Sequence, residues 1–172
     1  QRDGRVEVLA RVDPREITEL TKRRDDEMGK LFLFLGRLDV HQKGLDILLS
    51  AVRKAAAEFR KSKSRILIVG SFDTKRDESI LIKTIKRWSL GDIVRIEGPK
   101  FEDEKRNIIL GSDAFIHTSR YEGMPMAVLE AMALGKPCLV TPGTNLGQAI
   151  GEFSAGWETD INPERIADCF IR

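Results

Sequence analysis

The sequence predicts an α/β fold in which a parallel sheet carries helices on both faces. Two observations predict it. From residue 31 to the chain end, short apolar runs alternate with amphipathic segments of helical spacing, a pattern typical of strands joined by crossover helices. In addition, half of the 14 glycines fall in the loops that follow the apolar runs. At 172 residues the chain is long enough for one domain with a substantial core.

Six short runs are the predicted strands, because each is rich in apolar residues and is bounded by glycine, proline or charged residues. The first, LFLFL at 31–35, is apolar throughout, as expected of a strand buried on both faces. RILIVG follows at 65–70 and ends in a glycine. The remaining predicted strands lie at 93–98, 113–118, 136–141 and 154–158.

The predicted helices lie between these strands, where apolar residues recur three or four positions apart. The clearest two span 45–60 and 76–89, and residues 101–110 form the next. Pro125 is expected to open another helix, because proline is favoured in the first turn. A short helix is expected at 146–150, and Pro163 begins the last one.

Residues 1–30 differ from the rest of the chain. They are densely charged with only scattered apolar residues, so we interpret them as a hinge or connecting segment. Pro14 could open a short helix within it, through about Thr21. The domain itself is therefore predicted to occupy 31–172.

The balance of charge excludes some kinds of partner. The chain has 29 basic and 27 acidic residues, a net charge of +2. This is a mixed surface and not a nucleic-acid footprint, so any anion site must be local. The longest nearly apolar stretch, 31–35, is far too short to cross a bilayer. Cys138 and Cys169 are interpreted as free thiols, in agreement with a reducing compartment.

Several catalytic motifs are missing from the sequence. His41 and His117 lack metal-ligand spacing, and there is no DxD pair of the kind that holds a divalent cation in some sugar-transfer enzymes. Neither GxxxxGK[ST] nor GxSxG occurs, which argues against ATP hydrolysis and against a hydrolase elbow. We therefore expect no metal site, and we interpret His117 as a strand-end residue, not as a catalytic base.

The loop GRLDVHQKG after the first strand holds candidates for anion binding. In parallel sheets a ligand binds outside the carboxyl ends of the strands, and this loop carries Gly36, Arg37 and Lys43. A guanidinium can grip two phosphate oxygens and an ammonium supplies a point charge, so together they could neutralise a diphosphate without a metal. The same residues also occur on solvated surfaces, and their spacing alone does not separate the two interpretations.

A second candidate site is the run SRYEGMPMAVLEAMALGKPCLVT, in which Glu122 and Glu130 stand eight residues apart. An α-helix turns about 100° and rises roughly 1.5 Å per residue, so eight residues bring a side chain back to within about 80° of its starting direction, about 12 Å along the axis. Gly123 and Pro125 permit a tight entry into the helix. Two acceptors with this spacing suit an extended, hydroxyl-rich ligand.

Five segments in order carry a resemblance to a known family: FLFLGRLDVHQKGLDILLSAV, RILIVGS, IVRIEGP, DAFIHTSRYEGMPMAVLEAMALGKPCLVTPGTNLGQAI and SAGW. They resemble the donor-binding half of a retaining GT-B glycosyltransferase, in the family typified by bacterial group 1 glycosyltransferases. The resemblance covers about residue 31 to the chain end. Its core is the E-x7-E motif of the family, matched by Glu122 and Glu130 with the EAMALGKP continuation. One departure is Gly70-Ser71-Phe72, where the family has a G-x-G loop.

The resemblance implies a role for each matching residue. Arg37, which directly follows Gly36, and Lys43 match the basic pair that binds the donor diphosphate and stabilises the departing nucleotide. Glu122 matches the glutamate that contacts the transferred sugar, and Glu130 the one that accepts hydrogen bonds from the ribose hydroxyls. Backbone amides near the sugar hydroxyls and the phosphates are expected from Gly123, Met124 and Met126, and Pro125 belongs to the same substrate-binding segment. The base is expected to rest against residues 98–100, which include Gly98 and Lys100.

The resemblance also implies what the chain does within a larger enzyme. GT-B enzymes have two lobes with the reaction in the cleft between them. This chain is therefore expected to be the carboxyl-terminal lobe of a metal-independent retaining hexosyltransferase, with a nucleotide-diphosphate sugar as donor and no cofactor. An acceptor glycan or lipid would bind through the amino-terminal lobe, which this chain lacks. The isolated domain would bind donor weakly and transfer little, and the enzyme would be cytoplasmic, with peripheral membrane association compatible with the family.

Two other functions stay open at this point. A nucleotide-sugar epimerase of the GT-B type would share the alternation of strands and helices, but its chemistry is expected to need carboxylates and a histidine from both lobes. A noncatalytic nucleotide- or sugar-binding module would need neither a glutamate at the sugar nor the Arg and Lys pair at the leaving group.

Overall fold

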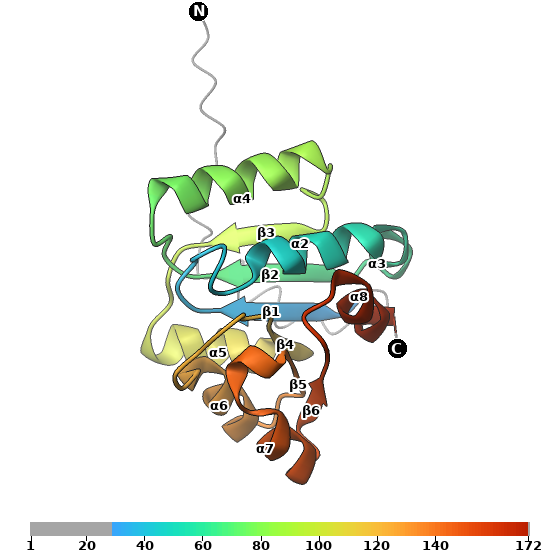
Figure 1. Cartoon of the computed structure of the whole chain (residues 1–172). Coiled ribbons are helices and arrows are strands. Elements are labelled where there is room, and N and C mark those ends of the chain that lie inside the picture. Colours follow the sequence, from blue (N-terminus) through green and yellow to red (C-terminus); the bar gives the residue numbers. More distant parts are fainter. Residues whose placement is uncertain (1–28, 172) are drawn as a thin grey trace, which may run out of the picture.

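The structure, a computed structural model that describes residues 29–171, confirms the predicted fold class. In this range a six-stranded parallel sheet carries helices on both faces (Figure 1). The helix predicted to begin at Pro14 lies outside the described residues, as does nearly all of the predicted connector at 1–30.

The strands follow the order β3-β2-β1-β4-β5-β6 across the sheet. Pairing between β1 and β2 runs from Leu31↔Arg65 to Leu35↔Val69. On its other side β1 pairs with β4, so the chain returns to the middle of the sheet after its third strand. The bounds are β1 Leu31–Leu35, β2 Arg65–Val69, β3 Val94–Glu97, β4 Ala114–His117, β5 Cys138–Val140 and β6 Gly156–Glu158.

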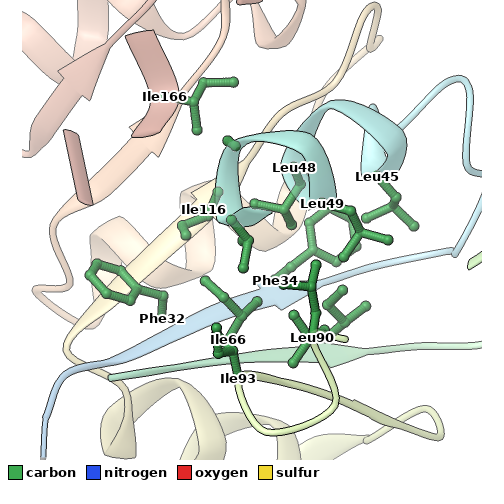
Figure 2. Packing of buried hydrophobic residues seen from close by; sticks show 14 of the residues in the cluster. Phe32, Phe34, Leu45, Leu48, Leu49, Ile66, Leu90, Ile93, Ile116 and Ile166 are labelled. Carbon is green, nitrogen blue, oxygen red and sulfur yellow. The ribbon is translucent and has the colours of Figure 1, made fainter. Parts of the chain in front are cut away.

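One face of the sheet packs against four helices: α2 (Leu45–Lys54), α3 (Ala56–Ser62), α4 (Lys75–Arg87) and α8 (Pro163–Ile171). Figure 2 shows side chains of α2, including Leu48, packed against Phe34 of β1 and Ile66 of β2. Phe34 and Leu48 are fully buried. The opposite face packs against α5 (Glu102–Gly111), α6 (Met126–Ala133) and α7 (Gly147–Glu152), around Phe115 of β4.

The predicted helix at 45–60 is two helices in the structure, separated at Ala55. The break is local, because the Ala55 amide still donates to the Ala51 carbonyl and the Phe59 amide to the Ala55 carbonyl, the spacing of an uninterrupted helix. Val52, Ala56 and Phe59 are buried across the break. The apolar stripe that predicts the helix is therefore continuous even though the regular helix is not.

The other predicted elements have bounds within two residues of the observed ones, and the largest local difference lies in the glycine-rich loop before α7. There, residues Pro142–Thr144 form a short 3-10 helix, η1. The last strand begins at Gly156 instead of residue 154, because Ser154 has a positive φ of 50° and lies in a turn. Neither difference moves the strand ends that carry the candidate site.

A close approach between two loops fixes the geometry on the carboxyl side of β1 and β4. Gly44 precedes α2 in the left-handed conformation, with φ of 63°. A Cβ atom built there would lie 2.1 Å from the Thr118 carbonyl oxygen, far inside van der Waals contact. The Thr118 hydroxyl in turn lies 3.1 Å from the carbonyl oxygens of Lys43 and Gly44. Only glycine therefore allows the two loops to come this close.

We expect Gly44→Ala to lower the free energy of unfolding by about 2 to 4 kcal/mol, the sum of the left-handed strain and the clash. The clashing atom is a backbone oxygen, so no side-chain rotation relieves it. Urea denaturation followed by circular dichroism measures the change. Gly91→Ala is the matched control, because a Cβ atom at Gly91 meets no atom within 4 Å. Equal stability of the two variants would contradict this account.

Candidate functional site

The candidate site lies where the order of the strands reverses. Successive strands run outward from β1 to β3, and the chain then returns to the other side of β1 with β4. The loops that leave β1 and β4 therefore depart side by side and in opposite directions at the carboxyl ends of these strands, the place where open α/β sheets bind their ligands. The two loops are also joined directly, because the Arg120 amide donates to the Gln42 carbonyl at 2.8 Å. The structure thus brings together the two candidate sites of the sequence.

Glu122 is the centre of this site. Its Oε1 atom lies 2.5 Å from Lys43 Nζ, 2.9 Å from His117 Nε2 and 2.6 Å from Ser119 Oγ. Only 7% of the Glu122 side chain and 12% of the Lys43 side chain are exposed. Burial alone would raise the pKa of Glu122, but the hydrogen bonds from His117, Lys43 and Ser119 outweigh it and lower the pKa to about 2. Glu122 is therefore ionised at neutral pH.

His117 is part of the site although no role there was predicted for it. It is the last residue of β4, as predicted, and only 2% of its side chain is exposed. Its ring stacks on Phe34 at a centroid distance of 5.2 Å. Burial lowers the pKa of His117, against the opposing effect of Glu122. The neutral ring donates through Nε2 to Glu122, and Nδ1 has no hydrogen-bond partner.

Arg37 follows β1, as predicted, but its partners are other than Glu122. Its guanidinium donates to Asp73 Oδ1 at 2.8 Å and to Gln42 Oε1 at 2.7 Å. Half of the Arg37 side chain is exposed, so this pair holds the guanidinium only weakly. Asp73 and Gln42 were not singled out in the sequence. Gln42 lies within the candidate loop itself, and Asp73 lies in the loop after β2.

Glu130 lies in α6 and has a separate cationic partner. Lys105 of α5 places its Nζ 2.7 Å from Glu130 Oε1. Each of the two side chains is about one-third exposed. Glu122 and Glu130 thus share no hydrogen-bond donor, and each carboxylate has a lysine of its own. Lys105 was not predicted, because no motif connects it with a residue 25 positions further along the chain.

The segment 123–126 forms the entry to α6. Pro125 is its N-terminal cap residue and is buried, whereas Gly123, Met124 and Met126 are exposed. The Met126 amide donates to the Met124 carbonyl at 2.9 Å. Within residues 29–171, no group accepts a hydrogen bond from the amides of Gly123 and Met124. These two N–H groups lie just before the N-cap of α6 and can therefore receive a hydroxyl or phosphate oxygen.

The predicted base contacts, Gly98 and Lys100, follow β3. Lys100 Nζ lies 3.7 Å from Glu97 Oε2, and the Glu97 side chain is 4% exposed. This pair comes from the edge strand of the sheet, whereas Glu122 follows a central one. The structure does not join residues 98–100 to the cluster around Glu122 by any hydrogen bond.

Among the described residues no three His, Cys, Asp or Glu side chains are grouped so that they could hold a metal ion. No helix in the same part of the chain is both long and apolar enough to cross a bilayer.

Solved structures of glycosyltransferases have the same fold. HepE of Anabaena, in complex with UDP, superposes with a TM-score of 0.74 at 20% identity, covering 92% of this chain and 42% of that protein. WaaG, a glycosyltransferase involved in lipopolysaccharide biosynthesis, gives a TM-score of 0.72 at 18% identity, covering 93% of this chain and 41% of WaaG. These likenesses confirm the fold as that of one part of a GT-B enzyme.

Curated relatives point in the same direction. Mannosylfructose-phosphate synthase of Agrobacterium fabrum is 30% identical over 135 residues, which are 77% of this chain and 30% of the relative. An uncharacterized glycosyltransferase of Methanocaldococcus jannaschii is 31% identical over 147 residues, covering 84% of this chain and 35% of the relative. The chain thus spans about a third of the length of these relatives.

The model of the family "Glycosyl transferases group 1" matches residues 16–172, which is nearly the whole chain. The match includes both candidate loops and the glutamate-bearing helix α6. Together with the fold, it shows that this chain belongs to the group 1 glycosyltransferase family.

Proposed function

We propose that this chain is the donor-binding lobe of a retaining glycosyltransferase that moves a sugar from a nucleotide-diphosphate donor to an acceptor without a metal ion. The observation that carries the proposal is the ion pair between Lys43 and Glu122, which joins the two candidate loops at the carboxyl ends of β1 and β4. A cation for the diphosphate and a carboxylate for the sugar hydroxyls thus stand side by side.

The charges of the site suit the departure of a nucleoside diphosphate. When the anomeric bond breaks, negative charge grows on the diphosphate, and donors that are already in place stabilise it. Lys43 and Arg37 supply positive charge for this purpose, and Gly123 and Met124 supply free backbone N–H groups just before α6. These groups can provide the stabilisation that a divalent cation provides in other enzymes.

The two glutamates act as acceptors at the two ends of the donor. Glu122, ionised and next to Lys43, accepts hydrogen bonds from the transferred sugar, and Glu130 accepts those of the ribose hydroxyls. The ribose hydroxyls would either displace Lys105 from the Glu130 carboxylate or bind the carboxylate oxygen that Lys105 does not contact. HepE, solved in complex with UDP and glucose, supports a donor of this chemical class.

A second lobe outside this chain completes the enzyme in this proposal. It binds the acceptor, a glycan or a lipid, and gives the whole protein its peripheral association with the cytoplasmic membrane. Relatives whose names refer to colanic acid biosynthesis support a glycan product.

We expect this chain to bind at least one nucleotide sugar in a titration series of UDP-, GDP- and ADP-sugars. Isothermal calorimetry measures the affinity, and addition of EDTA should leave it unchanged because Arg37, Lys43 and backbone amides supply the charge. The absence of any binding at millimolar concentration would argue against the assignment. Loss of binding in EDTA would refute the metal-independent part alone.

Lys43→Met and Glu122→Gln are expected to differ in which ligand they affect. Loss of Lys43 should weaken the binding of the nucleoside diphosphate and of the nucleotide sugar alike, by roughly 10- to 100-fold, because a charged hydrogen bond to the diphosphate is lost. Loss of the Glu122 charge should weaken the binding of the nucleotide sugar much more than that of the nucleoside diphosphate.

Lys54→Met serves as the matched control for the lysine variant, since Lys54 lies at the opposite end of α2 and forms an exposed pair with Glu164. In the full-length enzyme, Glu122→Ala should also abolish sugar transfer. A noncatalytic binding module would bind the ligand but show no transfer to lose, and an epimerase would convert the nucleotide sugar without an acceptor.

A further inference from the structure

The His117 side chain reaches the candidate donor site, and the proposed function gives it no task. It is buried at the end of β4, where its ring also lies near Phe115, at a centroid distance of 6.2 Å. A polar side chain in such a place costs free energy unless its groups are paired. Nε2 is paired with Glu122 and Nδ1 has no partner. The whole polar contribution of His117 is thus directed at Glu122.

Three donors converge on one oxygen of Glu122 and leave the other oxygen open. Lys43, His117 and Ser119 all donate to Oε1. No described residue donates to Oε2. Within residues 29–171, the buried side-chain atoms without a hydrogen-bond partner belong to Glu97 and His117 and do not include Glu122 Oε2, so Oε2 is not enclosed. Oε2 is therefore the oxygen that a sugar hydroxyl can reach.

The three donors differ in what a ligand would do to them. Lys43 is a flexible cation, and a donor diphosphate would draw its ammonium away from Glu122. His117 is fixed by the strand and by ring stacking on Phe34, and Ser119 is fully buried. These two donors cannot follow the phosphate, so they stay on Oε1 when Lys43 leaves.

We propose that His117 is a positioning residue of the donor site: with Ser119 it keeps Oε1 of Glu122 in place when Lys43 turns to the donor diphosphate, so that Oε2 stays directed at the transferred sugar. This inference rests on the proposed function for the identity of the ligand. The contacts on which it depends, however, exist without any ligand.

Two substitutions in this chain separate positioning from packing. His117→Phe keeps an aromatic ring beside Phe34 and Phe115 but removes the N–H donor. His117→Gln removes the ring and can keep an amide N–H near the place of Nε2. Ser119→Ala removes the other fixed donor and serves if His117→Phe fails to fold. His41→Gln is the control, because His41 is exposed and its side chain has no partner among the described residues.

The first measurement needs no ligand. Carbon-13 NMR follows the titration of the Glu122 carboxyl group, assigned with Glu122→Gln. In the unchanged protein this group should stay ionised to the lowest pH at which the domain remains folded, since its pKa is about 2. In His117→Phe or Ser119→Ala the midpoint should rise by about one to two pH units, and less in His117→Gln. Equal midpoints in all of these proteins and the His41→Gln control would overturn the proposal.

The second measurement compares two ligands on the same variants. The preference for a nucleotide sugar over its nucleoside diphosphate should fall about tenfold in His117→Phe and recover in His117→Gln. A role in packing alone would instead lower thermal stability and leave this preference and the Glu122 titration unchanged. If the unchanged protein binds none of the UDP-, GDP- and ADP-sugars, the proposed function fails, while the Glu122 titration still decides whether His117 positions the carboxylate.

Discussion

The contact between Gly44 and the backbone of Thr118 is the constraint on which the site depends. The parallel sheet brings the carboxyl ends of β1 and β4 next to each other, but this alone leaves the directions of the two loops open. Because Gly44 is left-handed and has no side chain, the start of α2 can lie directly against the Thr118 backbone. The Thr118 hydroxyl lies within hydrogen-bond distance of the carbonyl oxygens of Lys43 and Gly44. Lys43 precedes this contact and Ser119 follows it. Both side chains therefore reach Glu122.

The environment of Glu122 decides what kind of chemistry it can perform. A glycosidase needs one carboxyl group whose pKa is raised, so that it can donate a proton to the leaving oxygen. Here three hydrogen-bond donors lower the pKa of Glu122 more than burial raises it, so the carboxylate stays ionised far below neutral pH. Glu122 is suited to accept hydrogen bonds and to balance the charge of Lys43. It is not suited to act as a general acid. Glu130 does not share its contacts, because Glu130 is paired with Lys105.

The sequence was sufficient to predict the fold and the positions of the strand ends, because the alternation of apolar runs is a local signal. It also placed Arg37, Lys43 and Glu122 in loops that the strand order then brought to one edge of the sheet. Contacts between side chains were a different matter. Each histidine directly follows an apolar residue, and no motif marks either of them. Only the fold shows that His117 contacts Glu122, whereas His41 is exposed. Lys105 and Asp73 likewise have no signal, since their partners lie on other elements.

The observed ion pairs are consistent with the proposed preference for a diphosphate over a neutral sugar. Arg37 is paired with Asp73, Lys43 with Glu122 and Lys105 with Glu130, so the positive and negative charges of these side chains balance. A ligand must replace a partner that it displaces, because an unpaired charge in a half-buried place is costly. A neutral hydroxyl cannot replace a carboxylate for Lys43, whereas a phosphate can. In the proposed function, Lys43 thus exchanges the Glu122 carboxylate for a phosphate, while His117 and Ser119 keep their hydrogen bonds to Glu122 Oε1.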